Sequence, residues 1–412
     1  MRTKHSLLIA AALFALILAG LMVMFPAESF RASLKGMSIW WDVLFPALFP
    51  FFVISEMMLG VGIVHFFGTL LDPLMRPLFR IPGIGGFVVA MGFASGYPVG
   101  ARLTSQLWSQ GLVNREEGER LVAFTTSSDP IFLVGVVSVG FFQDPALAGI
   151  LAVAHYGSAM LIGLLMRFHG RKQPASVSSG LPAAKDGRGI WPRAFDAMHV
   201  ARLADGRSLG VMFQQALSSG LQLVLVIGGL VVFFSVVMEV MTASGIMSFF
   251  YASIDSVLGL FGVPLVLSQA VVNGFFEVTL GAKAAGAAAG IPLMYKAAIA
   301  AWVLSWAGLS VHGQIVSLLH HTNLRYFPFL AARFLHGLLA AGLVLVLWAP
   351  LAPYHETLRT FMPELDVTRP LTNLLGYTLP SAGVVFTAML GSLLLLSVLF
   401  FIGKRWMNAM RT

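Results

Sequence analysis

The amino-acid sequence predicts an all-α membrane protein, with about eight transmembrane helices and two re-entrant hairpins in two inverted-topology repeats with broken helices. Three observations predict this class. Of the 412 residues, 58% are hydrophobic and 11% are charged, whereas charged residues approach a quarter of a soluble domain. Many apolar runs reach the roughly 20 residues that a helix needs to cross a bilayer. The two halves of the chain also resemble each other in sequence.

The apolar runs place the crossings. The predicted spans are residues 7–25, 40–62, 116–142, 146–167, 214–241, 291–320, 328–349 and 381–402. The first run is longer than the core of a signal peptide and lacks a clear cleavage site, so a membrane span is expected there. Polar residues interrupt the third and sixth runs, which predicts broken helices.

Basic residues gather at the N-terminus, between residues 167 and 207, and at the C-terminus, in each case beside an apolar run. This pattern follows the positive-inside rule, so both termini and the long loop are expected in the cytoplasm. The net charge of +8 is therefore interpreted as a topology signal. A nucleic-acid partner is not expected, whereas the lipid bilayer is.

An internal duplication relates the two halves. Residues 51–67 laid on residues 234–250 are identical at eight positions without a gap, including Glu56 on Glu239. Three crossings in each copy is an odd number, so the copies are expected to thread the membrane in opposite directions. Inverted repeats with broken helices are typical of secondary transporters, which bind their solute near the middle of the membrane.

The duplication also sets the predicted organisation of the chain. Glycine-rich pieces at residues 83–110 and 265–287 predict one re-entrant hairpin in each copy. The predicted parts are an N-terminal span with its outer connection (1–38), the first repeat (39–167), a cytoplasmic loop (168–207), the inverted second repeat (208–350), an outer loop (351–380), and a last span with a cytoplasmic tail (381–412).

The stretch Ser95-Gly96-Tyr97-Pro98 predicts a break in the first hairpin. Proline lacks a backbone donor and disfavours a helical conformation at the residue before it. Broken backbone at membrane depth needs protein or a water-filled cavity around it. Ser95, Tyr97 and Arg102 are therefore candidate solute-binding residues. The alternative is a tight turn whose glycines serve packing alone.

A second break is predicted in the third crossing, where Asp129 precedes Pro130. Asp129 can cap the half-helix that begins at the proline, and its carboxylate is expected to face an interior cavity because lipid contact is costly. Ser127 and Ser128 offer hydroxyl groups to a solute. The alternative is a purely structural helix cap.

The second hairpin carries Asn273, Glu277, Thr279 and Lys283 close together. Asn273 and Thr279 are candidate solute ligands, and Glu277 or Asp129 is a candidate site for a coupling Na⁺ or H⁺. An internal ion pair between Glu277 and Lys283 is the alternative.

Other polar residues have simpler interpretations. Asn114 followed by Glu117 predicts a capping box at the start of the third crossing. A lone histidine such as His312 is more often a hydrogen-bonded core residue than a proton carrier. Glu56 and Glu239 are expected to brace the interfacial helices, and the alternative is that their side chains reach out to the membrane interface.

Several function classes are excluded. The absence of cysteine rules out disulfides, thiolate metal sites and cysteine nucleophiles. A phosphate-binding loop and a zinc-protease motif do not occur. A nucleophile, a base and an orienting acid are not predicted at the same depth in the membrane, as an intramembrane enzyme would need. We therefore expect no enzyme, no metal and no cofactor other than a coupling ion.

The segment GFASGYPVGARLTSQLWSQGLVNREEGERLVAFTTSSDPIFLVG, residues 92–135, resembles the YlbJ family of sporulation integral membrane proteins, which carries the nucleoside-recognition or Gate domain. The resemblance implies a bacterial multi-pass inner-membrane protein connected with endospore formation. It also implies kinship with the membrane parts of concentrative nucleoside transporters and ferrous-iron permeases. The gates of those permeases use cysteines, which this chain lacks, and relatives often have a small residue where Asp129 stands.

Two functions follow as hypotheses. The first is a secondary transporter or permease for a small polar solute, including a nucleoside-like one, held between the hairpin tips and the helix breaks. The second is a membrane scaffold or assembly factor of the spore envelope that does not transport. A second copy of the chain or other sporulation membrane proteins are the expected partners besides lipid and solute.

Overall fold

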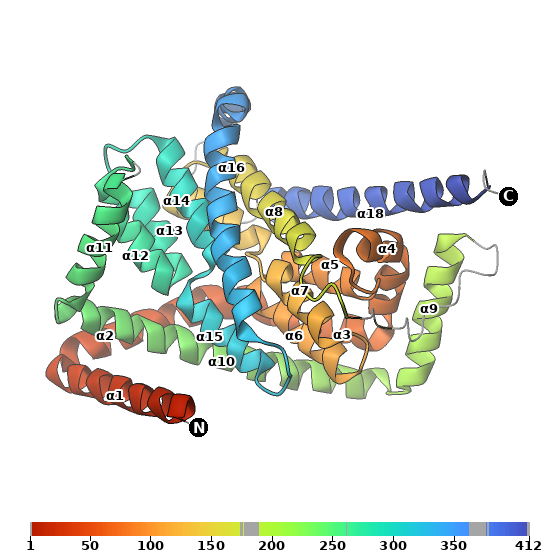
Figure 1. Ribbon diagram of the computed structural model, residues 1–412, viewed down its shortest axis with the longest axis horizontal. Coiled ribbons are helices and arrows are strands. Elements are labelled where there is room, and N and C mark those ends of the chain that lie inside the picture. Colours follow the sequence, from red (N-terminus) through yellow and green to blue (C-terminus); the bar gives the residue numbers. More distant parts are fainter. Residues whose placement is uncertain are drawn as a thin grey trace.

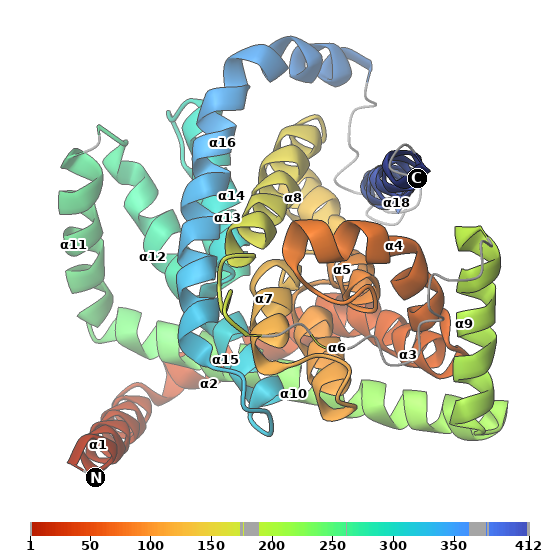
Figure 2. The ribbon, with the colours of Figure 1, turned by 45° about the vertical axis from the view of Figure 1, so that its right-hand side comes forward.

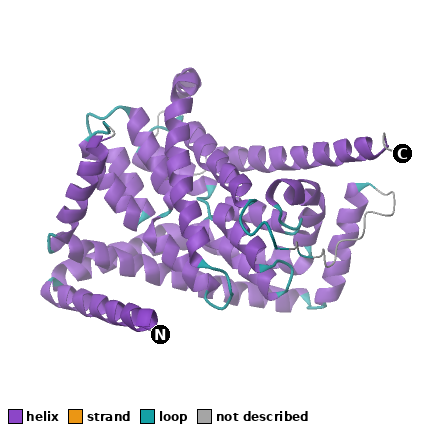
Figure 3. Ribbon diagram, viewed as in Figure 1, coloured by secondary structure: helices purple, strands orange, loops and turns teal. Residues whose placement is uncertain are grey.

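The computed structural model describes residues 2–173, 189–260, 262–361 and 379–409, together with Ser176 and Gly376. Within these ranges the chain forms helices joined by turns and loops, and no strand occurs (Figure 3). This confirms the predicted all-α class.

The first half of the chain contains both long and short helices. A long helical stretch consists of α2 (Pro26–Ser38), the π-helical turn η1 (Ile39–Leu44) and α3 (Phe45–Val61), and α1 (Arg2–Met24) precedes it. The first half continues with α4 (Ile63–Phe79), α5 (Gly85–Ser95), α6 (Tyr97–Ser109), α7 (Arg115–Thr125), the π-helix η2 (Phe132–Phe141) and α8 (Leu147–Met166).

The second half repeats this order after α9 (Ile190–Asp205). Its elements are α10 (Leu209–Ala243), α11 (Ile246–Leu260), the 3₁₀ turn η4 (Leu265–Leu267), α12 (Ser268–Phe276), α13 (Val278–Ala287), α14 (Leu293–Trp306), α15 (Gly308–Leu319) and α16 (Tyr326–Phe361). The last described helix is α18 (Leu379–Ala409). Each half therefore contains a long helix, a short helix, two broken helix pairs and a further helix of at least 20 residues.

Corresponding long helices run in opposite directions. The stretch α2–α3 lies along α10, and the two run antiparallel (Figures 1 and 2). Trp40 holds this contact, because its indole N–H donates to the Val224 carbonyl at 2.9 Å. An ideal Cβ at Gly228 would lie 2.4 Å from that indole nitrogen, so only glycine lets the tryptophan approach.

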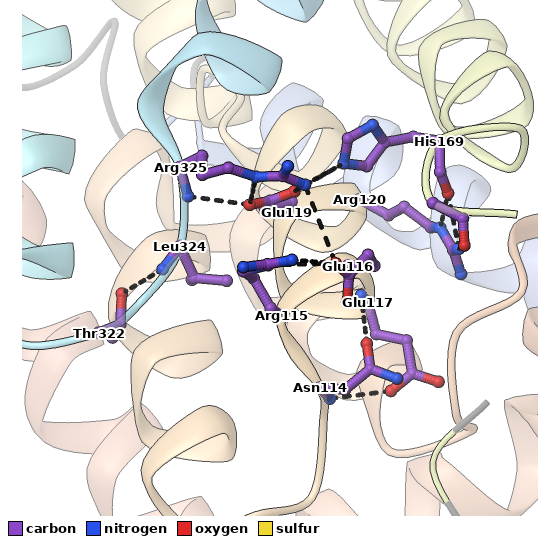
Figure 4. Close-up of polar contacts among 11 residues, drawn as sticks. Asn114, Arg115, Glu116, Glu117, Glu119, Arg120, His169, Thr322, Leu324 and Arg325 are labelled. Atoms are coloured by element: carbon purple, nitrogen blue, oxygen red, sulfur yellow. Dashed lines mark hydrogen bonds and ion pairs between the residues drawn. The ribbon is translucent and has the colours of Figure 1, made fainter. Parts of the chain in front are cut away.

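The helices α8 and α16 are also antiparallel, as their end contacts show. Beyond the end of α8, His169 Nε2 lies 2.6 Å from Glu119 of α7, and Arg325, just before α16, donates to the same carboxylate at 2.8 Å (Figure 4). At the opposite end, Asp144 precedes α8 and its Oδ2 lies 2.9 Å from Nε2 of His355, late in α16. The C-terminal end of α8 and the N-terminal end of α16, which the charge pattern places on one side of the membrane, therefore lie next to each other. That this side is the cytoplasmic one stays a prediction.

The number of apolar helices long enough to cross a membrane is five within the described ranges, or up to seven if each bent helix pair counts as one span. The sequence predicted about eight. The remaining crossing, 116–142, consists of α7 and η2 separated by a non-helical stretch, and the first turns of α7 carry the charged run REEGER. These charges and the break explain why the segment does not form one continuous apolar span. The capping box at Asn114 and Glu117 is confirmed.

Within the predicted cytoplasmic loop, 168–207, the structure contains the helix α9, which the loop prediction did not include. It packs along α4, where Phe66 contacts the rings of Trp191 and Phe195 at centroid distances of 6.2 and 5.0 Å. The apolar residues of IWPRAFDAMHVARL recur at helical spacing, which is the signal for this helix. At the other predicted loop, α16 reaches Phe361, and residues 362–375 lie outside the described residues.

The junction of α9 and α10 is expected to loosen in acid. Arg207 donates to Asp205 at 2.6 and 2.8 Å, and this hydrogen bonding lowers the pKa of the Asp205 carboxyl. A carboxyl with a lowered pKa in the folded protein stabilises it above the unfolded pKa, near 4, and that contribution is lost as the pH falls further. A spin label at His199→Cys should therefore become more mobile below about pH 4. With Asp205→Asn the label should be mobile at every pH, and a pH response that survives this change would contradict the assignment.

Candidate functional site

Both hairpins are broken, the first where the sequence predicted a break and the second at Glu277, for which no break was predicted. The first ends one helix at Ser95 and starts the next at Tyr97. The residue between them, Gly96, has φ 88° and ψ −175°, a conformation that only glycine adopts without strain. In the second hairpin Glu277 separates α12 from α13 with an extended backbone. Its carboxylate accepts a hydrogen bond from the Leu280 amide at 2.7 Å and so caps α13.

The third and sixth crossings are broken as well. Residues 126–129 are non-helical, and Asp129 Oδ1 accepts from the Phe132 amide at 2.8 Å, which confirms the predicted cap. In the sixth crossing, Ala307 separates α14 from α15, and both Ala307 and Gly308, the first residue of α15, have φ of 75°. Each half therefore has two breaks.

The two breaks of each half touch each other. An ideal Cβ at Gly96 would lie 3.1 Å from Asp129 Oδ2, and one at Gly308 would lie 3.0 Å from the Glu277 Cα. The first hairpin break thus contacts the break of the third crossing, and the second hairpin break contacts that of the sixth. The two pairs of breaks are built in corresponding ways from the two halves.

Side chains then join the halves. The Tyr97 hydroxyl, from the first half, donates to the Leu304 carbonyl of the second half at 2.8 Å. His155 of α8 lies between both halves: its Nε2 is 2.7 Å from Ser127 Oγ, and its Nδ1 is 2.8 Å from Ser305 Oγ. The Ser128 amide donates to the same Nε2 at 3.0 Å. Since Nε2 must accept that bond, the proton of the neutral ring lies on Nδ1.

Arg333 of α16 connects the two broken crossings. Its guanidinium donates to the carbonyls of Thr126 and Ser305, at the ends of α7 and α14. The last carbonyls of a helix lack donors within the helix and carry partial negative charge, so a cation stabilises them. Beside it, His336 Nε2 lies 3.0 Å from the His155 carbonyl, and the two imidazoles stack at 5.2 Å.

We call this group the polar centre. Its members are the side chains or backbone groups of Ser95, Tyr97, Thr126, Ser127, Ser128, Asp129, His155, Ser305, Arg333 and His336. Three of its buried polar atoms have no hydrogen-bond partner among the described residues: Ser95 Oγ, Arg333 Nε and His336 Nδ1. Such atoms also occur at scattered positions elsewhere, including Gln106 and Asp144, but here three lie in one group. Because a buried unpaired polar group is costly, these three atoms need an explanation.

Most of the predicted residues of the first half belong to this centre. Tyr97, Ser127, Ser128 and Asp129 are placed there by the contacts above, and Ser95 directly precedes Gly96, whose added Cβ would lie 3.1 Å from Asp129 Oδ2. Their common source is the pair of breaks that Pro98 and Pro130 introduce.

Arg102 lies elsewhere. Its guanidinium donates to Glu56 at 2.8 Å and to the Ser219 carbonyl at 3.2 Å, so it ties α6 to α3 and α10. Gln106 adds a second bond to Glu56 at 3.3 Å. Glu56 thus braces the first hairpin, whereas the sequence suggested that it braces an interfacial helix.

The predicted residues of the second half lie around the Glu277 break. Thr279 is half-buried in the first turn of α13, and Asn273 accepts a hydrogen bond from the Tyr251 hydroxyl at 3.1 Å. Lys283 is exposed. Among the described residues, Glu277 and Lys283 do not form an ion pair. His312 lies 2.8 Å from the Tyr326 hydroxyl and 3.1 Å from the Trp306 carbonyl, which is the hydrogen-bonded core role.

Sequence reasoning missed Arg333, His155 and His336. They lie inside the apolar runs 328–349 and 146–167, which were interpreted as plain spans. A signal was present, because an ionisable residue within a membrane helix usually faces the protein interior and is functional. In addition, His155 and His336 are separated by 181 residues, nearly the 183 that separate Glu56 from Glu239. The duplication therefore places the two histidines at corresponding positions of the two halves.

These features define a class: a multi-span α-helical membrane protein in which paired helix breaks from two halves of one chain surround a buried polar centre. Among the described residues no three histidine, aspartate or glutamate side chains are grouped so that they could hold a metal ion.

Comparison with known proteins gives the family. A family model described as nucleoside recognition, Gate, matches residues 42–154. The sporulation integral membrane protein YlbJ of Bacillus subtilis (strain 168) is 42% identical over 367 residues, which cover 88% of each chain. The chain belongs to the YlbJ family of sporulation integral membrane proteins.

Two further similarities are weaker. An uncharacterized protein of Alkalihalophilus pseudofirmus is 26% identical over 121 residues, or 26% of each chain. A solved structure of a CNTnw variant in an outward-facing state covers 84% of this chain and 87% of its own, with 12% identity and a TM-score of 0.37. That score is too low to establish a common fold.

Proposed function

We propose that this chain is a secondary transporter for a small polar solute, which binds at the polar centre between the two halves. The observation that carries the proposal is the set of three unpartnered buried atoms, Ser95 Oγ, Arg333 Nε and His336 Nδ1. A polar solute that bonds to them would remove the cost of their burial. A scaffold has no such need, because polar groups that serve packing alone can be paired within the protein.

The chemistry of these atoms indicates the kind of solute. Arg333 Nε is a donor, His336 Nδ1 is an acceptor in the tautomer whose Nε2 donates to the His155 carbonyl, and the Ser95 hydroxyl can do both. A matching solute has donors and acceptors of its own and is not a simple ion. A nucleoside-like solute fits this description, and its base could stack on the Tyr97 ring. The nucleoside-recognition description of the matching family model supports the same class.

The two carboxylates are proposed to couple transport to an ion. Asp129 Oδ1 and Glu277 Oε2 cap their half-helices, and the same carboxylates would take up Na⁺ or H⁺ when the site is loaded. The two helix N-termini that Asp129 and Glu277 cap are thereby already neutralised, so an anionic solute gains little from these two. Rocking of the oppositely directed halves about the polar centre would then expose it to either face in turn. The proposed setting is the bacterial inner membrane, with both termini in the cytoplasm.

The test uses Ser95→Ala. Because the Ser95 hydroxyl has no partner within the described protein, its loss should not lower the midpoint of thermal unfolding. Loss of one hydrogen bond to the solute should weaken binding by about 3- to 10-fold. Solutes are first found by a thermal-shift screen of a metabolite library that includes nucleosides, and their affinity is then measured by calorimetry.

The matched control is Ser138→Ala. Ser138 is equally buried, but its hydroxyl donates to the Leu133 carbonyl of its own helix at 3.0 Å, so its loss should leave affinity unchanged. In proteoliposomes Glu277→Gln should abolish ion-driven accumulation and leave binding in place. A library without any stabilising solute, or equal affinity in Ser95→Ala, would favour the scaffold of the spore envelope instead.

A further inference from the structure

A groove lies between the end of α8 and the start of α16, apart from the polar centre. Its volume is about 430 Å³, and its walls are apolar. The α8 wall consists of Ile162, Leu165 and Met166, and the α16 wall of Phe327, Pro328, Ala331, Ala332 and Leu335. The exposed fractions of Leu165 (48%) and Phe327 (74%) show that the groove opens to the outside of the protein.

The surroundings of this groove restrict what can fill it. Both α8 and α16 are apolar enough and long enough to cross a membrane. An outward-facing apolar groove on such helices faces hydrocarbon, because water there would leave the apolar walls hydrated. An acyl chain is the apolar ligand that a bilayer supplies, and it matches walls built from leucine, isoleucine and phenylalanine.

One end of the groove is polar and basic. His169 and Arg325 line it there. Arg325 donates to Glu119 through Nε and Nη2, and this holds its guanidinium in place, as Figure 4 shows. The side chain of Arg325 is 49% exposed, and Nη1 is not used in those bonds. A fixed guanidinium with a remaining donor is well suited to a phosphate oxygen.

More positive charge follows directly in the sequence. Arg167, Arg171 and Lys172 come just after α8 and are exposed. Glu116 and Glu119 are instead engaged with Arg115 and Arg325. The rim of the groove therefore carries net positive charge at the level where the apolar helices end. Basic pockets between membrane helices at this level bind anionic headgroups.

We propose that this groove binds an anionic phospholipid, with an acyl chain between α8 and α16 and the phosphate at Arg325 and the neighbouring basic residues. The lipid would contact the last long helix of each half at once. It would thus fasten the two halves together at the face where Glu119, His169 and Arg325 meet.

The experiment compares two lipids with identical acyl chains on the purified full chain. Native mass spectrometry should show retention of phosphatidylglycerol over phosphatidylcholine, and the anionic lipid should raise the midpoint of thermal unfolding more. Arg167→Gln should weaken the retention of phosphatidylglycerol about fivefold, since it removes one rim charge and leaves the Glu119 cluster intact. Arg31→Gln, an exposed arginine on α2, is the control and should change nothing.

A second variant tests the groove itself. Ala331→Trp should fill the groove and displace the lipid, and circular dichroism should show normal helix content. Equal retention of both lipids, or unchanged phosphatidylglycerol binding in Ala331→Trp, would overturn the proposal. The proposal would also be overturned if the purified protein were a dimer that Ala331→Trp dissociates, because a second copy of the chain would then occupy the groove.

Discussion

Replacing Arg333 by methionine should destabilise the protein by about 3 kcal/mol or more. The side chain is fully buried, and one guanidinium donates to two carbonyls, of Thr126 and Ser305, at the ends of two broken helices. Methionine fills a similar volume but offers no donor, so both carbonyls would stay buried and unpaired. The midpoint of thermal unfolding in detergent measures the loss.

Two comparisons make this prediction specific. Arg333→Lys keeps the charge, but an ammonium lacks the planar fork that reaches two carbonyls, so its stability should be intermediate. Arg31→Met removes an exposed arginine that pairs with Glu28 one turn away and should cost less than about 0.5 kcal/mol. If Arg333→Met were as stable as Arg31→Met, Arg333 would not join the two halves.

The second large effect is expected at Gly281 in the second hairpin. An ideal Cβ there would lie 2.2 Å from the Gly274 Cα and 2.5 Å from its nitrogen. These are backbone atoms of the facing helix α12, which cannot move aside as a flexible side chain can. Gly281→Ala should therefore separate α12 from α13 and cost more than about 3 kcal/mol, or prevent recovery of folded protein.

The same substitution at Gly229 is the control for this effect. Gly229 lies within α10 and has no atom within 4 Å of an added Cβ. Alanine there gains helix propensity of up to about 1 kcal/mol, so Gly229→Ala should be neutral or slightly stabilising. Equal unfolding midpoints for the two variants would show that the hairpin is not packed through Gly281.

The helix breaks could be predicted from the sequence because their causes are local. Pro98 and Pro130 each remove a backbone donor, and Asp129 supplies the cap that its half-helix needs, so neighbouring residues decide the outcome. The capping box at Asn114 and Glu117 was predictable for the same reason. The basic residues beside the apolar runs likewise indicated that the end of α8 and the start of α16 lie on the same side of the membrane.

Long-range pairing could not be predicted in this way. The partner of Arg102 is Glu56, 46 residues away, and nothing near either residue indicates which acid meets which base. Arg333 bonds to carbonyl groups, which every residue has, so its two partners leave no trace in the sequence. The helix α9 was missed because it stands in a segment, 168–207, that is rich in basic residues, serine, glycine and proline and resembles a loop, although the apolar spacing within the helix is helical.

The central claim is that two oppositely directed halves close around one polar centre. Side-specific cysteine labelling tests it most directly, because the chain has no cysteine of its own. Arg167 follows α8, and Tyr354 lies late in α16, so they mark the corresponding ends of the two halves. In intact cells a membrane-impermeant maleimide should label Tyr354→Cys and leave Arg167→Cys unlabelled until the membrane is opened. Labelling of both from the same face would contradict the claim.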